Sequence, residues 1–319
     1  MSFSTYAELN NQMILHFQNK EYQQALDLIS LEGVGFPKER LLVDYWMMCS
    51  AARLDNRALV YQVAEKCLSD GLWYGEMMWR MTPSFQGLQG DADFERIVAA
   101  SQALQEKDNP SKEQVVLKYL PEKISDSSPV LIALHGNQNT ASSTLPFWQS
   151  ALSKGYVLAV PQSSQPIFKD AFIWDDLDTS FAEIKACYES LKKELGFDNR
   201  QIILAGHSMG GLVAIQMAMS NEVPVRGFVV NGPALPFGDA QDELDKLLPS
   251  VRERGLRAYF IIGEKDVDIE QDEIRAFVSK LKSWLVGSKP NNNTILPCNS
   301  CCRKPINNFR SPSFSRNIS

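Results

Sequence analysis

The sequence predicts an α/β protein, a mostly parallel sheet flanked by helices, preceded by a small all-α domain of helical hairpins. Apolar residues recur at helical spacing over roughly the first 107 residues. From residue 115 onward, short apolar runs alternate with helical segments, which is the pattern of parallel strands covered by helices. The hydrophobic fraction of 44% and the charged fraction of 22% are those of an ordinary globular protein.

The spacing of apolar residues in 1–107 predicts paired amphipathic helices. The first pair turns at a polar segment, residues 19–21, and the second pair is expected at 41–52 and 58–68. Gly71 stands where a C-terminal helix cap belongs. The first turn resembles that of a tetratricopeptide repeat, although the full consensus is absent. Such a domain either binds a protein partner or packs as a helical cap, and both interpretations stay open.

The polar segment 108–114 contains a proline and no apolar rhythm, which predicts a linker. The second domain is expected over residues 115–286. Its predicted strands are 115–119, 130–134, 156–160, 201–205, 227–230 and 258–262, and its clearest helices are 181–195, 212–219 and 274–285. In such sheets the ligand crevice lies outside the carboxyl ends of the strands.

The most informative motif follows the strand predicted at 201–205. Gly206, Ser208 and Gly210 form the pattern G-x-S-x-G, and a helix follows directly. A nucleophilic serine on a tight strand-to-helix turn leaves no room for side chains two positions away, which explains the glycines. The helix N-terminus directs its N–H groups and positive dipole end at a developing oxyanion. We therefore interpret Ser208 as a catalytic nucleophile.

A second motif, Leu134-His135-Gly136-Asn137, closes a predicted strand about 70 residues before the serine. Together the two motifs resemble the α/β-hydrolase superfamily, and the likeness is greatest to its carboxylesterase/phospholipase and dienelactone-hydrolase-like branches. The resemblance covers residues 115–285 and implies the α/β-hydrolase fold. It also implies that the backbone N–H groups of Asn137 and Met209 form the oxyanion hole, while His135 shapes the loop.

In this superfamily the acid of the triad follows a late strand, and the histidine comes after it. Asp266 matches the acid position, with Glu264 and Asp268 as alternatives and solvated loop carboxylates as the non-catalytic interpretation. Phe172 and Trp174 come from a region that often lines the substrate pocket in relatives. Packing in the core explains these aromatic residues equally well.

The catalytic histidine is not identifiable in this sequence. The chain contains three histidines, His16, His135 and His207, and none follows Asp266. A serine hydroxyl without a general base is a poor nucleophile, because it is hardly ever ionised near neutral pH. Loss of one triad member typically costs several orders of magnitude in rate.

The composition changes abruptly after residue 286. Residues 287–319 contain five basic residues, seven Asn and no Asp or Glu, so we expect a disordered tail. One hypothesis is a frameshift or truncation of an intact hydrolase, and the alternative is a natural pseudo-enzyme. Cys298 and Cys301 form only half of a zinc site, so no metal is expected.

These observations predict a serine hydrolase that cleaves an ester or thioester through an acyl-enzyme on Ser208. The alternative is an inactive hydrolase-like domain coupled to a helical protein-interaction module. No cofactor is implied. The net charge of -6 argues against nucleic-acid and anionic-membrane partners, which select basic surfaces. A cytoplasmic location is expected, because no signal peptide is recognisable and Cys49, Cys67 and Cys187 sit singly as buried thiols.

Overall fold

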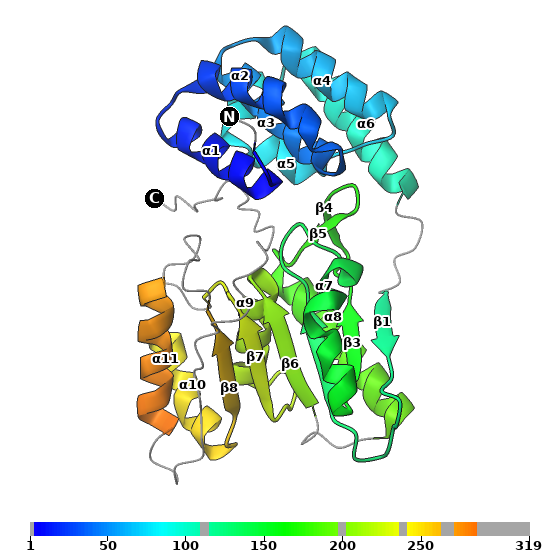
Figure 1. Cartoon of the computed structure of the whole chain (residues 1–319), viewed down its shortest axis with the longest axis vertical. Coiled ribbons are helices and arrows are strands. Elements are labelled where there is room, and N and C mark those ends of the chain that lie inside the picture. The colour runs from blue at the N-terminus through cyan, green and yellow to red at the C-terminus, as the bar shows by residue number, and fades with distance from the viewer. Residues whose placement is uncertain (1–2, 109–114, 197–201, 236–240, 263–270, 286–319) are drawn as a thin grey trace. The chain divides into compact units, whose positions relative to one another are not determined.

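A computed structural model describes residues 3–108, 115–196, 202–235, 241–262 and 271–285 (Figure 1). The described residues form two compact units. The helical unit contains the chain up to residue 108 together with Pro166–Lys169, and the α/β unit contains the remainder. Most of the predicted linker (109–114), the acid candidate Asp266 and the tail 287–319 lie outside the described residues.

The helical unit confirms the expected helices. Its elements are α1 (Tyr6–Gln18), α2 (Tyr22–Glu32), η1 (Gly33–Gly35), η2 (Pro37–Glu39), α3 (Arg40–Arg53), α4 (Arg57–Ser69), α5 (Glu76–Met81), η3 (Pro83–Leu88) and α6 (Ala92–Asp108). Thr5 begins α1 with a capping box, because its hydroxyl accepts the Glu8 N–H while the Glu8 carboxylate accepts the Thr5 N–H. Gly71 follows α4 with φ +72°, the left-handed conformation expected of a residue after a helix end. The resemblance to tetratricopeptide repeats stays a prediction.

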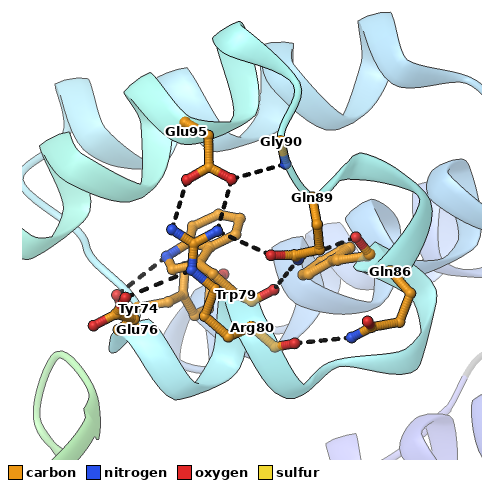
Figure 2. A network of polar contacts seen from close by, with 9 residues as sticks. Tyr74, Glu76, Trp79, Arg80, Gln86, Gln89, Gly90 and Glu95 are labelled. Carbon is orange, nitrogen blue, oxygen red and sulfur yellow. Dashed lines mark hydrogen bonds and ion pairs between the residues drawn. The ribbon is translucent and has the colours of Figure 1, made fainter.

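A polar network joins α5, η3 and α6 (Figure 2). The Arg80 guanidinium donates to both oxygens of Glu95, at 2.7 and 2.6 Å, and to Gln89 Oε1 at 2.9 Å. This pairing holds the pKa of Glu95 at about 2. Gln89 in turn donates to the carbonyl of Trp79 at 3.0 Å. The network therefore fixes the short helix α5 over the aromatic core that Trp79 shares with Phe85 and Phe94.

Residues 166–169 complete the helical unit, although they lie between strands in the sequence. Gly75 N donates to Ile167 O at 2.7 Å, and Lys169 N donates to Trp73 O at 3.1 Å. The Lys169 ammonium also donates to Asp108 at 2.8 Å, at the end of α6. Backbone and charged contacts thus attach this short segment to the helices.

The α/β unit is built on a sheet whose described strands run in the order β1-β3-β2-β6-β7-β8 (Figure 1). These strands are β1 (Val116–Tyr119), β2 (Val130–Leu134), β3 (Val157–Pro161), β6 (Ile202–His207), β7 (Gly227–Asn231) and β8 (Arg257–Ile261). β1 runs antiparallel to β3, and the other pairs are parallel. The predicted strands and the mostly parallel sheet are confirmed.

Helices connect these strands and cover the sheet. They are α7 (Ala141–Trp148), η4 (Gln149–Lys154), α8 (Leu177–Leu195), α9 (Met209–Ser220), α10 (Gln241–Glu253) and α11 (Gln271–Leu285), and β4 (Gln165–Phe168) pairs with β5 (Ala171–Ile173) in a separate hairpin. Ile132 and Leu134 face the larger core, which includes side chains of α8 to α11. Leu131 and Ala133 face a smaller core that includes α7. β2 is therefore buried on both faces, which explains its unbroken apolar run.

The cysteines within the described residues, Cys49, Cys67 and Cys187, are buried and free, as expected. Burial raises the pKa of Cys49 and of Cys187 to about 12, so these thiols are not ionised near neutral pH. Within the described part of the chain, no helix combines the length and the apolarity that crossing a membrane requires.

Candidate active site

Ser208 stands on a sharp turn between β6 and α9. Its backbone adopts φ 51° and ψ -120°, a conformation that residues with a Cβ rarely tolerate. The turn is held on both sides, because Ser208 N donates to Asn231 O at 3.2 Å and Ala234 N donates to Ser208 O at 3.1 Å. The half-buried side chain has no hydrogen-bond partner among the described residues. A strained backbone thus presents a free hydroxyl at the carboxyl edge of the sheet.

The glycines on either side of Ser208 are required by close backbone approaches. A Cβ on Gly206 would lie 2.3 Å from Gly210 O, and a Cβ on Gly210 would lie 2.2 Å from His135 O. Both distances are far inside van der Waals contact with backbone atoms, which have little freedom to move. The steric reason predicted for the motif is therefore present in the structure.

The loop after β2 lies directly beside this turn. Leu134 pairs with Gly206 in the parallel register of β2 and β6, so both chains leave the sheet at neighbouring positions. A Cβ on Gly136 would lie 3.4 Å from Ser208 Cβ. The backbone N–H groups of Asn137 and Met209 donate to no acceptor among the described residues. Their role as an oxyanion hole stays a prediction that this arrangement supports.

Residues around β5 hold the loop in place. Gln138 N donates to Phe172 O at 2.7 Å, and Trp174 N donates to Asn137 Oδ1 at 3.2 Å. The Trp174 indole N–H donates to His135 O at 2.8 Å, and its ring lies over the His135 imidazole with centroids 4.7 Å apart. Phe172 is half-buried, whereas Trp174 is fully buried. The sequence singled out both residues as pocket candidates, which stays untested, but did not reveal that they fasten the loop.

We expect Trp174→Phe to weaken this loop. The change keeps an aromatic ring but removes the donor to His135 O, and a buried carbonyl left without its partner costs about 1–3 kcal/mol. Urea denaturation would show the lower free energy of unfolding. Trp148→Phe is the matched control, because the indole nitrogen of buried Trp148 has no hydrogen-bond partner among the described residues. Equal losses in the two variants would contradict the role of the hydrogen bond.

The contacts of His135 indicate a structural role. Nδ1 lies 2.8 Å from Gly136 O, so it carries the proton, and Nε2 accepts from Ser163 N at 3.2 Å and Gln162 Nε2 at 3.1 Å. Burial lowers the pKa of His135 to about 4. The imidazole is thus neutral near pH 7, with both nitrogens engaged. Gln162 and Ser163, which directly follow β3, were not singled out from the sequence.

The other two histidines are also engaged. His207 Nδ1 donates to Asn231 O at 2.9 Å, and its ring is stacked with the half-exposed ring of Phe147, with centroids 6.2 Å apart. His16 belongs to the helical unit, where Nδ1 lies 2.7 Å from Glu21 Oε2. Asn231 therefore organises the turn by accepting from both the serine backbone and the preceding imidazole. Because the acceptor is a backbone carbonyl, the residue type at position 231 carries no sequence signal for this role.

The predicted acid, Asp266, and its alternatives Glu264 and Asp268 lie outside the described residues. The preceding strand, β8, is parallel to β7, and Gly232 N donates to Ile261 O at 2.9 Å. β8 therefore ends at the same edge of the sheet as β7. The described residues contain no cluster of three or more His, Cys, Asp or Glu that could hold a metal ion.

One protein family and several solved structures are similar to this chain. Residues 131–288, just under half of the chain, match the Alpha/beta hydrolase family. Similar solved structures include an uncharacterized protein from Bacillus cereus, 25% identical over 88% of this chain and 88% of its own, with a TM-score of 0.46. The Bacillus cereus carboxylesterase is 17% identical over 56% of this chain and 84% of its own, with a TM-score of 0.41. An acetyl xylan esterase from Aspergillus awamori is 16% identical over 56% of this chain and 77% of its own, with a TM-score of 0.43.

No curated protein matches the chain. The match to the family supports a hydrolase. With its mostly parallel sheet, its serine on the turn between β6 and α9 and this family match, the second unit has the α/β-hydrolase fold.

Proposed function

We propose that the α/β unit is a serine hydrolase that cleaves an ester or thioester through an acyl-enzyme on Ser208. The observation that carries the proposal is the backbone of Ser208, held at φ 51° and ψ -120° between glycines that have no room for a side chain. Strain of this kind costs on the order of 1–3 kcal/mol and is concentrated at functional sites. A serine that only packed or capped a helix would not need it.

The chemistry follows from the groups around the hydroxyl. Ser208 Oγ attacks the carbonyl carbon, and the oxyanion formed would be stabilised by the N–H groups of Asn137 and Met209 and by the N-terminus of α9. Collapse of this intermediate breaks the bond to the alcohol or thiol, which leaves with the proton given up by Ser208 Oγ. Water then attacks the acyl-enzyme and releases the acid. Asp266 is proposed as the acid that would orient a general base.

A second candidate is an inactive hydrolase-like domain coupled to a helical, tetratricopeptide-like module that binds a protein. One observation favours it: His207 is the last histidine in the sequence, so none follows Ser208. Residues 209–319 therefore supply no histidine for the general base of the usual chain order, and loss of the base typically costs several orders of magnitude in rate. We therefore expect catalysis by this chain to be slow.

Labelling with a fluorophosphonate, which phosphonylates activated serines, separates the two candidates. We expect the full chain to be labelled slowly at Ser208, with the site assigned by mass spectrometry of peptides. Ser208→Ala and Ser208→Gly should both abolish labelling. The glycine variant is the better control, because glycine tolerates positive φ and the turn keeps its conformation.

Absence of labelling in folded wild-type protein would overturn the hydrolase proposal and leave the inactive domain as the better explanation. Labelling that persists in Ser208→Gly would also overturn it, because another nucleophile would then be responsible. If the folded wild-type protein is not labelled, the next measurement would be whether the helical unit captures a protein partner.

A further inference from the structure

The amino edge of the sheet, opposite Ser208, carries a cavity of about 460 Å³. It lies in the α/β unit, where β7 and β8 begin, next to the end of α9 and the turn after α10. Its lining residues are Asn221, Pro224, Val225, Arg226, Arg254, Gly255 and Arg257. A Cβ on Gly255 would meet no atom within 4 Å, so this glycine borders open space.

Three arginines, Arg226, Arg254 and Arg257, line this cavity. Arg226 and Arg257 lie next to each other at the starts of β7 and β8, since Arg257 N donates to Arg226 O at 3.0 Å. Both side chains are exposed. Neither they nor Arg254 forms an ion pair with any carboxylate in the described residues, and nearby Glu222 is turned to Lys185, at 3.7 Å. The lining of the cavity therefore carries a local excess of positive charge, although the net charge of the chain is -6.

Arg254 is held rigidly among the three. Its Nη1 donates to Ala218 O at 3.0 Å and to Asn221 Oδ1 at 3.1 Å, and its Nη2 donates to Met219 O at 2.7 Å. Nε donates to Ser250 Oγ at 3.2 Å. One of the five N–H groups of the guanidinium therefore remains to be satisfied. The partners of Arg254 are neutral, so its charge is fixed in position but not neutralised.

We propose that this cavity binds a small molecule bearing a phosphate group. The guanidinium groups of Arg226 and Arg257 can pair with phosphate oxygens in a planar, bidentate arrangement, and a dianion would neutralise more of the local positive charge than a single carboxylate. The cavity exceeds the size of a phosphate ion, which leaves space for an attached organic group. The site lies at the opposite edge of the sheet from Ser208, so it binds without taking part in the chemistry there.

Isothermal titration of the full chain with sodium pyrophosphate, at constant ionic strength set with chloride, tests the proposal. We expect saturable binding of one ion per chain. Arg226→Gln and Arg257→Gln combined should weaken it at least tenfold, and because both side chains are exposed, the thermal unfolding midpoint should barely move. Arg254 is left unchanged, because its contacts with the end of α9 are structural.

Arg252→Gln is the matched control, since Arg252 is an exposed arginine of α10 that does not line the cavity. Its affinity for pyrophosphate should equal that of the wild type, and so should that of Ser208→Gly. No saturable binding to the wild type would overturn the proposal, as would an equal loss in Arg252→Gln, which would indicate only general attraction of anions. Titration with inorganic phosphate, expected to bind more weakly, tests whether charge beyond one phosphate group contributes.

Discussion

Gly210→Ala should lower the free energy of unfolding by about 3 kcal/mol and abolish labelling of Ser208. The added methyl group would lie 2.2 Å from His135 O and 2.8 Å from Leu134 O, both backbone atoms. His135 O is itself fixed by the Trp174 indole, and Leu134 belongs to a strand buried on both faces. The clash of the added methyl group can therefore be relieved only if α9 moves away from β2, and this movement would displace Ser208. Urea denaturation and fluorophosphonate labelling measure the two effects.

Gly87→Ala is the control for this prediction. A Cβ on Gly87 would meet no atom within 4 Å, and the residue does not have a positive φ. We expect its unfolding midpoint to stay within error of the wild type. If Gly210→Ala were as stable as Gly87→Ala, the close approach of α9 to the loop after β2 would be wrong.

Acidification should destabilise the α/β unit before most carboxylates titrate. Burial lowers the pKa of His135 to about 4, from an ordinary value of 6.5. Above pH 6.5 both folded and unfolded chains hold a neutral imidazole, so burial of neutral His135 carries no protonation penalty and stability is at its full value. Between pH 6.5 and 4 only the unfolded chain takes up the proton. Stability is therefore lost as pH falls, by about 1 kcal/mol per pH unit near pH 5.5 and about 3 kcal/mol in total.

Hydrogen exchange of the β2 and β6 amides between pH 7 and 5, corrected for intrinsic exchange rates, reports this loss. His135→Asn is the matched variant, because its amide can still donate to Gly136 O while it has no proton to gain. It should be less stable than the wild type at pH 7, since Ser163 N loses its acceptor, but its stability should change less between pH 7 and 5. Equal pH dependence in the two proteins would show that other groups cause the acid effect.

Local sequence patterns were sufficient for much of the sheet. β2 was predicted with its observed bounds because its unbroken apolar run is buried on both faces. The turn at Ser208 was predictable because steric crowding demands glycine at fixed positions. The cap at Gly71 followed from the same preference of glycine for positive φ. In each case a single strong physical requirement is written into a few adjacent residues.

The elements that were missed lack such a requirement. α7 was not predicted, and it contains Pro146, a residue type that disfavours helix interiors. A capping box at Thr140 nevertheless begins this helix, and Trp148 packs on the sheet. The hairpin of β4 and β5 is short, and its turn at Asp170 uses a positive φ without glycine. The role of Trp174 was hidden for another reason. Its partner His135 lies 39 residues away, and no local pattern reports a contact over that distance.

The helical unit is discontinuous in the sequence, and this limits how it can be exchanged between proteins. Recombination that transferred only residues 3–108 would leave Pro166–Lys169 behind, together with the acceptor of Gly75 N and the ammonium that contacts Asp108. A recipient would have to supply an equivalent hairpin at a position inside its own hydrolase domain. The helices and the hydrolase fold are therefore expected to be inherited as a pair. Insertions or deletions in the hairpin are expected to occur together with changes in α5 and α6.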